Sequence, residues 1–386
     1  MENFIVSARK YRPALFDSVV GQSHITTTLK NAIKSNHLAH AFLFCGPRGV
    51  GKTTCARILA KTINCQNLTS DTESCNECDS CKSFNTQSSF SIHELDAASN
   101  NSVDDIRNLV EQVRIPPQFG AKYKIYIIDE VHMLSQAAFN AFLKTLEEPP
   151  KYAIFILATT EKHKIIPTIL SRCQIFDFNR IQVKDISSHL ESIAKKENID
   201  YEPDALHLVA QKADGGLRDA LSMFDVIVTF SSGNKITYKQ AIDNLNILDY
   251  DYYFNITDAL MAEDLAQNLV LFDEILKKGF DGHNFIVGLS EHFRNLLVCK
   301  NPTTVKLLNV SETATKKYLS QSQAASASFL LSSLNIANQC DLNYKSSKNP
   351  RLHVELALMK MAHISSVLKL PASGEMSAEV KKKVTA

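Results

Sequence analysis

The sequence lacks three features that would place it in a special class of protein. No stretch reaches the roughly 18–20 apolar residues that a helix needs to cross a bilayer, and the N-terminal MENFIVSARKYRPALFDSVV lacks the apolar core of a secretory signal. Neither sign of charge is in excess, since 42 Lys and Arg against 41 Asp and Glu give a net charge of +1. The chain is therefore not a polycation, and any contact with nucleic acid must come from a local basic face. We expect a soluble, cytoplasmic protein without membrane contacts.

The 386 residues suffice for two or three domains with apolar cores. A content of 45% hydrophobic and 22% charged residues is typical of a globular chain. Up to about residue 178, helical patterns alternate with short apolar runs, which indicates a parallel sheet covered by helices. One of these helices should begin after Ser135 as N-cap and end before Pro149. The predicted strands are Ala41–Cys45, Ser91–Asp96, Lys124–Ile128, Ala153–Ala158 and Gln174–Phe178.

Beyond Arg180 the strands stop and the pattern becomes helical. Breaks at Gly215-Gly216 and Ser231–Asn234 divide the first part into a small bundle of helices. From about residue 250 to 368 the pattern stays helical, and the last residues lose periodicity like the start of a flexible linker. The bundle helices are expected at about 182–197, 203–213, 217–230 and 237–245, and one apolar face further on combines Ile286, Leu289, Phe293, Leu296 and Leu297.

The most specific motif is a complete GxxxxGK[ST] loop, Gly46-Pro47-Arg48-Gly49-Val50-Gly51-Lys52-Thr53. It follows the apolar run AFLFC, and a helix with Thr54 in its first turn comes after it, which is the context that the motif requires. Glycines let backbone N–H groups turn toward phosphate oxygens, and the start of the helix adds positive potential. Lys52 would reach the β- and γ-phosphates of ATP, and Thr53 would ligate Mg²⁺. The strand and the helix argue against a glycine-rich turn with a chance lysine.

A second motif places two carboxylates, Asp129 and Glu130, directly after the apolar run KIYII. The carboxyl ends of strands are where open α/β sheets bind ligands. We expect Asp129 to hold Mg²⁺ through water and Glu130 to act as a general base on the attacking water. Alone, such a pair would be read as a solvated strand end, but the loop around Lys52 favours the functional interpretation. His132 could pack at the start of a helix or support the catalytic groups.

Three further polar positions follow the ends of elements. Thr159 and Thr160 end an apolar strand, where one hydroxyl could contact the attacking water or the γ-phosphate. Arg172 and Arg218 each stand at an element boundary, and the planar guanidinium of arginine suits phosphate. A threonine at a strand end and a solvated or ion-paired arginine are nevertheless common, so these residue types alone do not assign a role.

Four of the nine cysteines gather in one segment, in the pattern C-x₉-C-x₂-C-x₂-C formed by Cys65, Cys75, Cys78 and Cys81. In a reducing compartment such a cluster indicates metal ligands rather than disulfides. Four thiolates can close a tetrahedral site around Zn²⁺, which makes the site structural. The polar surroundings cannot form an apolar core, so the metal would supply stability. An iron–sulfur cluster is the alternative, but the fourth cysteine lies upstream and no Cys-Pro follows.

Taken together and in order, these motifs resemble the gamma/tau clamp-loader subunits of bacterial DNA polymerase III across residues 1–245. The helical remainder is similar to the collar domain of that family, by length and pattern more than by motif. Gly216 stands where other members often have serine, which puts no role in doubt. The segments that carry the resemblance are YRPALFDSVVGQ at 11–22, the loop at 46–53, DEVHMLS at 129–135, KTLEEPP at 144–150, LATT at 157–160, ILSRC at 169–173 and GGLRDALS at 215–222.

The resemblance implies roles for residues whose type alone is ambiguous. Arg172 would complete the ATP site of a neighbouring subunit, whereas Arg218 would be the lid sensor that touches the γ-phosphate in its own chain. Thr160, with Thr159 beside it, lies where the family has its first sensor. Members of the family also carry a zinc module at the position of the cysteine cluster. The adenine pocket would be bordered by the segments Tyr11-Arg12-Pro13 and Val19-Val20-Gly21, which points to Arg12, Val19 and Val20.

The implied architecture is a RecA-like AAA+ P-loop ATPase domain with a zinc-binding insertion, an all-helical lid and an all-helical collar. The expected bounds are 1–179 for the ATPase domain, about 64–83 for the zinc module, 180–245 for the lid, 246–369 for the collar or oligomerisation domain and 370–386 for the start of the linker.

The resemblance also implies a function and partners. ATP binding would let an assembly with other clamp-loader subunits, expected to be pentameric, grip and open a sliding clamp. Hydrolysis, triggered by primed DNA, would then release the clamp onto the DNA during replication. Contacts with the polymerase and the helicase would lie in a C-terminal tail beyond this sequence.

Two other functions are compatible with parts of the sequence. A related AAA+ DNA-remodelling motor would usually carry a winged-helix domain, whereas residues 250–368 look all-helical. A clamp-loader-like scaffold with weak ATPase activity would have a decayed site, whereas Lys52, Thr53, Asp129 and Glu130 are all present.

Overall fold

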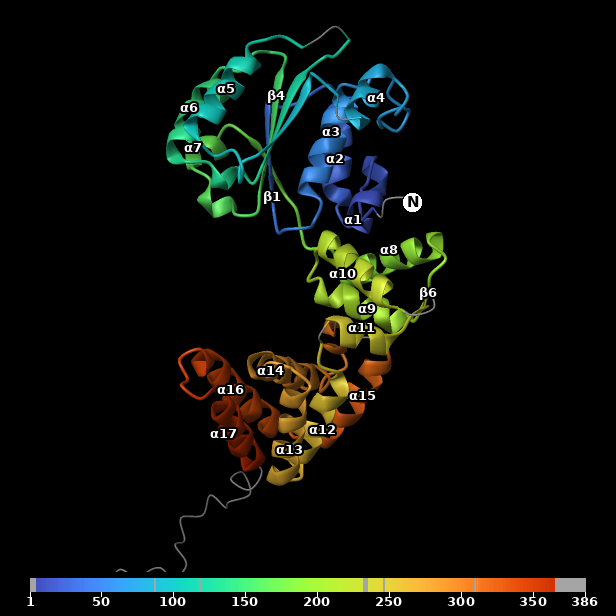
Figure 1. Cartoon of the computed structure of the whole chain (residues 1–386), viewed down its shortest axis with the longest axis vertical. Coiled ribbons are helices and arrows are strands. Elements are labelled where there is room, and N and C mark those ends of the chain that lie inside the picture. Colours follow the sequence, from blue (N-terminus) through green and yellow to red (C-terminus); the bar gives the residue numbers. More distant parts are fainter. Residues whose placement is uncertain are drawn as a thin grey trace, which may run out of the picture. The chain divides into compact units, whose positions relative to one another are not determined.

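The computed structural model describes residues 5–86, 88–117, 120–231, 235–245, 247–308, 310 and 312–364. Its internal contacts divide the chain into two compact units, Met1–Ala241 and Ile242–Ala386. In Figure 1 the first unit runs from blue to yellow and the second from yellow to red. The linker expected at 370–386 and most of the break expected at Ser231–Asn234 lie outside the described residues. No helix in the described part of the chain is long and apolar enough to cross a membrane.

A five-stranded sheet organises the first unit, and every pairing in it is parallel. The order β2-β3-β4-β1-β5 places β1 in the interior, between β4 and β5. Both β1 and β4 are buried along their whole length, as expected of strands with helices on both faces. The strands are β1 (Ala41–Cys45), β2 (Ile92–Asp96), β3 (Lys124–Asp129), β4 (Ala153–Thr159) and β5 (Gln174–Asp177). The predicted α/β fold is confirmed.

Helices cover both faces of this sheet (Figure 1). On one face, α2 (Ser23–Lys34) and α3 (Lys52–Ile63) pack with Phe42 and Phe44 of β1. On the other, α5 (Val103–Val113), α6 (Gln136–Glu147) and α7 (Pro167–Leu170) pack with Leu43. Ser135 caps α6 as predicted, because its Oγ accepts the Ala138 N–H at 3.2 Å. Shorter elements of the domain are α1 (Ser7–Lys10), η1 (Phe16–Ser18), α4 (Asp79–Asn85), η2 (Val131–Met133) and η3 (Lys162–Lys164).

The lid region differs in one detail from the all-helical expectation. Two two-residue strands, β6 (Asp200–Tyr201) and β7 (Lys235–Ile236), pair in parallel there, so the prediction that strands stop after Arg180 is wrong. Strands this short show no alternation of apolar and polar residues, which needs about four to eight positions to be visible. The helices of the region are α8 (Val183–Lys196), α9 (Pro203–Lys212), α10 (Leu217–Phe230) and α11 (Tyr238–Leu245).

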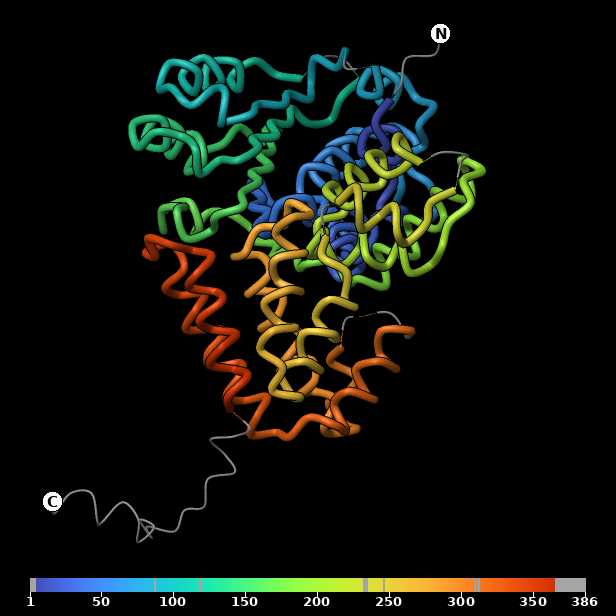
Figure 2. Tube along the Cα trace, turned by 60° about the horizontal axis from the view of Figure 1, so that its bottom comes forward, coloured from blue at the N-terminus to red at the C-terminus, as the bar shows by residue number. Residues whose placement is uncertain are grey.

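The second unit is helical throughout its described residues (Figure 2). Its core combines the apolar faces of several helices, and α14 packs along α16. On α14, Ile286, Leu289, Phe293 and Leu296 of the predicted face are fully buried, whereas Leu297 is partly buried. The helices are α12 (Tyr250–Met261), α13 (Leu265–Lys277), α14 (Gly282–Val298), η4 (Val305–Leu307), α15 (Glu312–Ala324), α16 (Ala327–Tyr344) and α17 (Pro350–Ala362).

Candidate nucleotide-binding site and cysteine cluster

The glycine-rich loop connects the end of β1 to the start of α3. Gly46 has a φ of 147°, and a Cβ there would lie 2.4 Å from the carbonyl oxygen of Phe178, so no other residue fits without moving the backbone. Gly51, with a φ of 103°, is the N-cap of α3 and adopts the left-handed conformation. The loop therefore curls over the N-terminus of α3, where backbone N–H groups are free of helical partners and suited to anions.

Lys52 is the first residue of α3 and is only 6% exposed. Its ammonium donates to the carbonyl oxygens of Gly46 at 2.8 Å and Pro47 at 2.7 Å, so the loop itself holds the side chain. Burial lowers the pKa of Lys52, while the carboxylates of Glu130 and Asp129 act in the opposite direction. The amine thus stands beside the loop, in reach of a phosphate that could replace these carbonyls as its partner.

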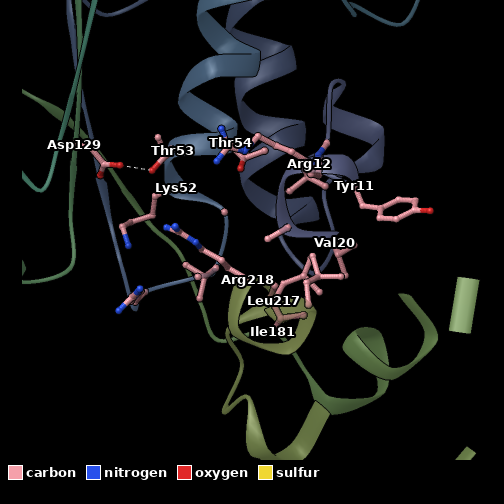
Figure 3. Close-up of a pocket in the computed structure, with 18 of the residues that line it drawn as sticks. Tyr11, Arg12, Val20, Lys52, Thr53, Thr54, Asp129, Ile181, Leu217 and Arg218 are labelled. Carbon is pink, nitrogen blue, oxygen red and sulfur yellow. Dashed lines mark hydrogen bonds between the residues drawn. The ribbon is translucent and has the colours of Figure 1, made fainter. Parts of the chain in front are cut away.

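The two side chains predicted to serve Mg²⁺ lie next to each other. Thr53 Oγ1 donates to Asp129 Oδ2 at 2.6 Å, although the residues come from α3 and the end of β3 (Figure 3). Both line the same pocket. A hydroxyl and a carboxylate are hard oxygen ligands of the kind that Mg²⁺ takes, so the pair fits this ion.

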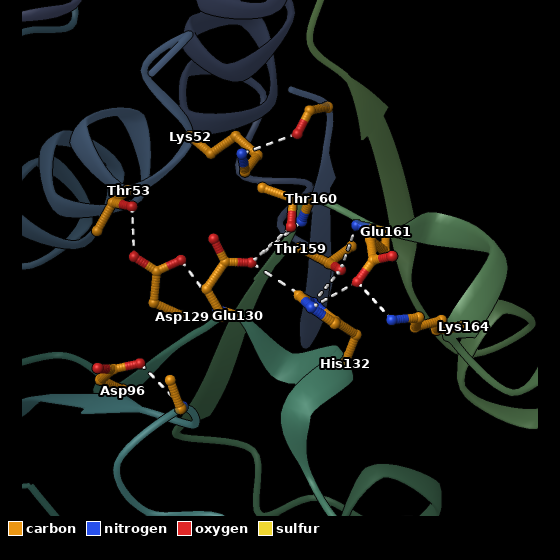
Figure 4. A network of polar contacts seen from close by, with 12 residues as sticks. Lys52, Thr53, Asp96, Asp129, Glu130, His132, Thr159, Thr160, Glu161 and Lys164 are labelled. Atoms are coloured by element: carbon orange, nitrogen blue, oxygen red, sulfur yellow. Dashed lines mark hydrogen bonds and ion pairs between the residues drawn. The ribbon is translucent and has the colours of Figure 1, made fainter. Parts of the chain in front are cut away.

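Glu130 directs its carboxylate toward the end of β4 (Figure 4). Thr160 donates to Glu130 Oε2 twice, from its backbone N–H at 3.2 Å and from its hydroxyl at 3.0 Å. Glu130 has a φ of 47°, a left-handed conformation that is uncommon outside glycine. The backbone turn and the two donors together fix where this carboxylate points.

The two neighbouring threonines have different surroundings. Thr159 is fully buried, and its hydroxyl contacts His132 Nδ1 at 3.0 Å and accepts the Glu161 N–H at 3.0 Å. His132 also lies 3.4 Å from Glu130 Oε2 and, through Nε2, 3.0 Å from Glu161 Oε2. Thr160 therefore contacts the expected base, Thr159 orients the imidazole, and His132 supports this polar network rather than only packing at the start of a helix (Figure 4).

The pocket at the loop has a polar end and an apolar end (Figure 3). The predicted residues Arg12, Val19 and Val20 all line it, and burial lowers the pKa of Arg12. Tyr11 and Pro13 of the expected Tyr-Arg-Pro segment line it as well. Sequence reasoning missed four other lining residues, although Leu217 and Leu221 stand one turn apart on α10 and flank Arg218. The missed residues are Ala8, Ile181, Leu217 and Leu221, and the loop with the first turn of α3 supplies Arg48, Gly49, Val50, Gly51, Lys52, Thr53 and Thr54.

The two arginines singled out in the sequence occupy different environments. Arg218 lines the pocket, and its backbone N–H donates to the Gly49 carbonyl at 3.3 Å, so the start of α10 lies against the glycine-rich loop. Arg172 is not among the lining residues of this pocket. Its guanidinium instead pairs with Glu147 at 2.6 Å and donates to the Thr168 carbonyl at 2.6 Å.

The four clustered cysteines converge as the spacing predicts. Their Sγ atoms all lie within 4.8 Å of one another, and all four are free thiols. Four thiolates around Zn²⁺ at about 2.3 Å would stand about 3.8 Å apart, so the donor set fits a tetrahedral zinc site. The N–H groups of Cys78 and Glu77 donate to Cys75 Sγ at 3.3 and 3.4 Å and lower the pKa of this thiol to about 6. Such donors favour the thiolate form that a metal requires.

Parallel-sheet domains with this loop, an acidic pair at the end of another strand and an arginine from a following lid form the AAA+ class of P-loop ATPases, and this fold and site belong to it. Three family models match successive parts of the chain. They describe the DNA polymerase III delta subunit at residues 21–182, the ATPase lid domain of a DNA polymerase III clamp loader subunit at 185–233, and domain III of DNA polymerase III subunits gamma and tau at 236–373.

Curated relatives point the same way. DNA polymerase III subunit tau of Bacillus subtilis is 42% identical over 359 residues, which cover 92% of this chain and 63% of the relative. DNA polymerase III subunit gamma of Buchnera aphidicola from Acyrthosiphon pisum is 34% identical over 364 residues, covering 93% of this chain and 99% of the relative. The chain belongs to the family of DNA polymerase III gamma and tau subunits. As nucleotide-dependent AAA+ proteins, members of this family use a nucleotide and Mg²⁺.

Among solved structures, the RuvB Holliday junction branch migration motor of Thermotoga maritima superposes with a TM-score of 0.46 at 20% identity, over 65% of this chain and 79% of that one.

Proposed function

We propose that this protein is the ATP-hydrolysing subunit of a clamp loader, which opens a sliding clamp and places it on primed DNA in association with the replicative polymerase. The observation that carries the proposal is the convergence of Lys52, Thr53, Asp129, Glu130 and Arg218 on one pocket. The relatives named above, all described as DNA polymerase III subunits, support the choice of process.

The geometry suggests how hydrolysis would proceed. The ammonium of Lys52 would exchange the carbonyls of Gly46 and Pro47 for β- and γ-phosphate oxygens. Bound Mg²⁺, held by Thr53 and Asp129, would neutralise phosphate charge. Because Thr160 occupies Oε2 of Glu130, we assign the acceptance of the water proton to Oε1.

Arg218, from the lid, would contact the γ-phosphate in the same chain. Since α10 begins against the loop, the presence of the γ-phosphate could then change the position of the lid relative to the sheet. Arg12, Val19 and Val20 would surround the adenine at the other end of the pocket.

We further propose domain bounds of 1–179 for the ATPase domain, with a zinc module at about 64–83, 180–245 for the lid, 246–369 for the collar and 370–386 for a linker. Other clamp-loader subunits in a pentamer, a sliding clamp and primed DNA are the proposed partners, and the cytoplasm is the proposed location. The chain spans 63% of the Bacillus subtilis relative. Contacts with the polymerase and the helicase are proposed in a C-terminal tail, as the resemblance to the family implies.

An ATPase assay with the assembled subunits tests this function. We expect slow basal hydrolysis that rises when sliding clamp and primed DNA are added together, because hydrolysis is coupled to release of the clamp. A related DNA-remodelling motor would respond to DNA without the clamp. A scaffold would show no stimulated hydrolysis in any combination, and either result would contradict the proposal.

We propose Zn²⁺ as the metal of the four-cysteine cluster, and elemental analysis should find about one equivalent per chain. A colourless protein is expected, whereas visible absorbance would indicate an iron–sulfur cluster. Cys78→Ser should lose the metal and lower the melting temperature, because a closed site contributes to folding. Cys173→Ser, outside the cluster, is the matched control. Full zinc content in the Cys78→Ser variant would contradict the assigned ligand set.

A further inference from the structure

Glu73, in the cysteine segment, has a buried carboxylate that contacts neither the thiols nor the lining of the nucleotide pocket among the described residues. Glu73 is 5% exposed and stands two residues before Cys75. Its own backbone is fixed by Thr69, whose hydroxyl accepts the Glu73 N–H at 3.1 Å and whose N–H donates to the Glu73 carbonyl at 3.0 Å. An ionised group at such a depth requires partners, because burial of an unpaired charge is strongly unfavourable.

Among the described residues, the hydrogen-bond and ion-pair partners of this carboxylate belong to the N-terminal part of the domain. Oε2 accepts the backbone N–H of Phe16 at 3.0 Å, and Oε1 accepts that of Asp17 at 3.0 Å. Oε1 also pairs with the ammonium of Lys30 on α2 at 2.8 Å. Glu73 thus binds the first N–H groups of η1, which have no partner within a helix and attract an anion.

Residues 13–20, which Glu73 contacts at Phe16 and Asp17, also form a wall of the nucleotide pocket. Phe16 is buried in the core with 1% exposure, and Pro13, Val19 and Val20 on either side of η1 line the pocket. The chain that follows this wall is fixed separately, because the side-chain amide of Gln22 donates to the carbonyl of Asn179 at 2.7 Å. The η1 end therefore depends on the cysteine segment for its anchor.

A second contact joins the cysteine segment to the helix of the glycine-rich loop. Lys61 of α3 is 3% exposed, and its ammonium donates to Asn76 Oδ1 at 2.6 Å. Asn76 stands between Cys75 and Cys78 and has a φ of 62°, so its place depends on the fold of the cysteine loop. The cysteine segment consequently contacts both α3, the helix that begins with Lys52, and the wall formed by residues 13–20.

We propose that Glu73 is a positioning residue through which the metal-bound cysteine module holds the apolar wall of the nucleotide pocket and so raises affinity for the base of ATP. This inference rests on the proposed function. The module would act on the base end, because Glu73 contacts the wall itself, whereas Asn76 meets α3 at Lys61, nine residues after Lys52. The phosphate end is built by the loop and by Lys52.

The test compares two ligands, ATP and inorganic triphosphate, by calorimetric titration of the whole chain. Glu73→Gln keeps the shape of the side chain but turns one N–H donor toward the N–H groups and the ammonium that the carboxylate accepts. We expect affinity for ATP to fall about tenfold, as the loss of one charge-assisted contact implies, while affinity for inorganic triphosphate changes less than about twofold. Asp71→Asn, which changes an exposed carboxylate of the same module, should leave both affinities unchanged.

Two further samples make the result independent of one variant. Lys30→Met retains the two amide contacts of Glu73 and should show a smaller loss, again for ATP alone. Wild-type protein stripped of its zinc, with Mg²⁺ restored, should show the same selective loss as Glu73→Gln. Glu73→Gln itself should retain one equivalent of zinc.

The outcomes separate the inference from the proposed function. Unchanged ATP affinity in Glu73→Gln, or equal losses for both ligands, would overturn the role of Glu73. If Glu73→Gln does not fold, unchanged ATP affinity in both Lys30→Met and the stripped wild type would overturn it. A wild-type protein that binds no ATP would instead overturn the proposed function, and the inference with it.

Discussion

Replacement of Glu130 by glutamine should leave ATP binding intact and lower the rate of hydrolysis by roughly 10²–10⁴-fold, the usual contribution of a general base. Glutamine has the same shape, and its amide oxygen can still accept the two hydrogen bonds that Thr160 donates to Oε2. It cannot accept a proton from water. The variant therefore removes proton transfer and keeps the geometry of the site.

Steady-state ATPase rates and equilibrium ATP binding together check this prediction. Lys52→Ala should lose ATP binding itself, because the phosphates lose their principal cationic partner. Glu111→Gln, an exposed glutamate on α5, makes the same chemical change away from the pocket and should behave as wild type. Full turnover by Glu130→Gln would exclude Glu130 from the mechanism.

The parts of the fold and site that could be predicted are those whose signal is contiguous in the sequence. The loop at 46–53 can be recognised because the spacing of its glycines and lysine, the strand before it and the helix after it all fall within a short segment. Three strands of the main sheet, β1, β3 and β4, are apolar runs, and β1 and β4 are buried along their whole length. The four cysteines are likewise close in sequence, so their spacing alone predicts that the thiols converge.

Features that depend on contacts between distant segments could not be predicted. Residue type alone does not distinguish Thr159 from Thr160, and only the family resemblance favoured Thr160. The structure separates them by their partners, because Thr159 contacts His132 and Thr160 donates to Glu130. Glu73 looks like any polar residue of the cysteine loop, since its partners lie 57 and 56 positions earlier in the chain. The pairing of β6 with β7 joins residues too few to show a pattern.

Arg172→Ala should bind ATP almost normally and lose stimulated hydrolysis in the assembly by about 10³–10⁵-fold, the range for an arginine finger. The pocket of its own chain already contains Arg218, and Arg172 is not among the residues that line it. Its guanidinium is held by Glu147 and by the Thr168 carbonyl, with the side chain 32% exposed. A partly exposed, ion-paired arginine outside the pocket of its own chain is suited to a phosphate on a neighbouring subunit.

A mixing experiment distinguishes action on a neighbour from action within the chain. Arg172→Ala chains retain an intact nucleotide site, and Lys52→Ala chains retain an intact Arg172. In oligomers that contain both, some interfaces place an intact site against an intact arginine, so part of the stimulated ATPase activity should return. Arg107→Ala, which removes an exposed arginine paired with Asp104 on α5, controls for loss of charge and should leave activity unchanged in any mixture. If oligomers shown to contain both chains recover no activity, Arg172 does not act across a subunit boundary, because the mixture supplies every group that such an action needs.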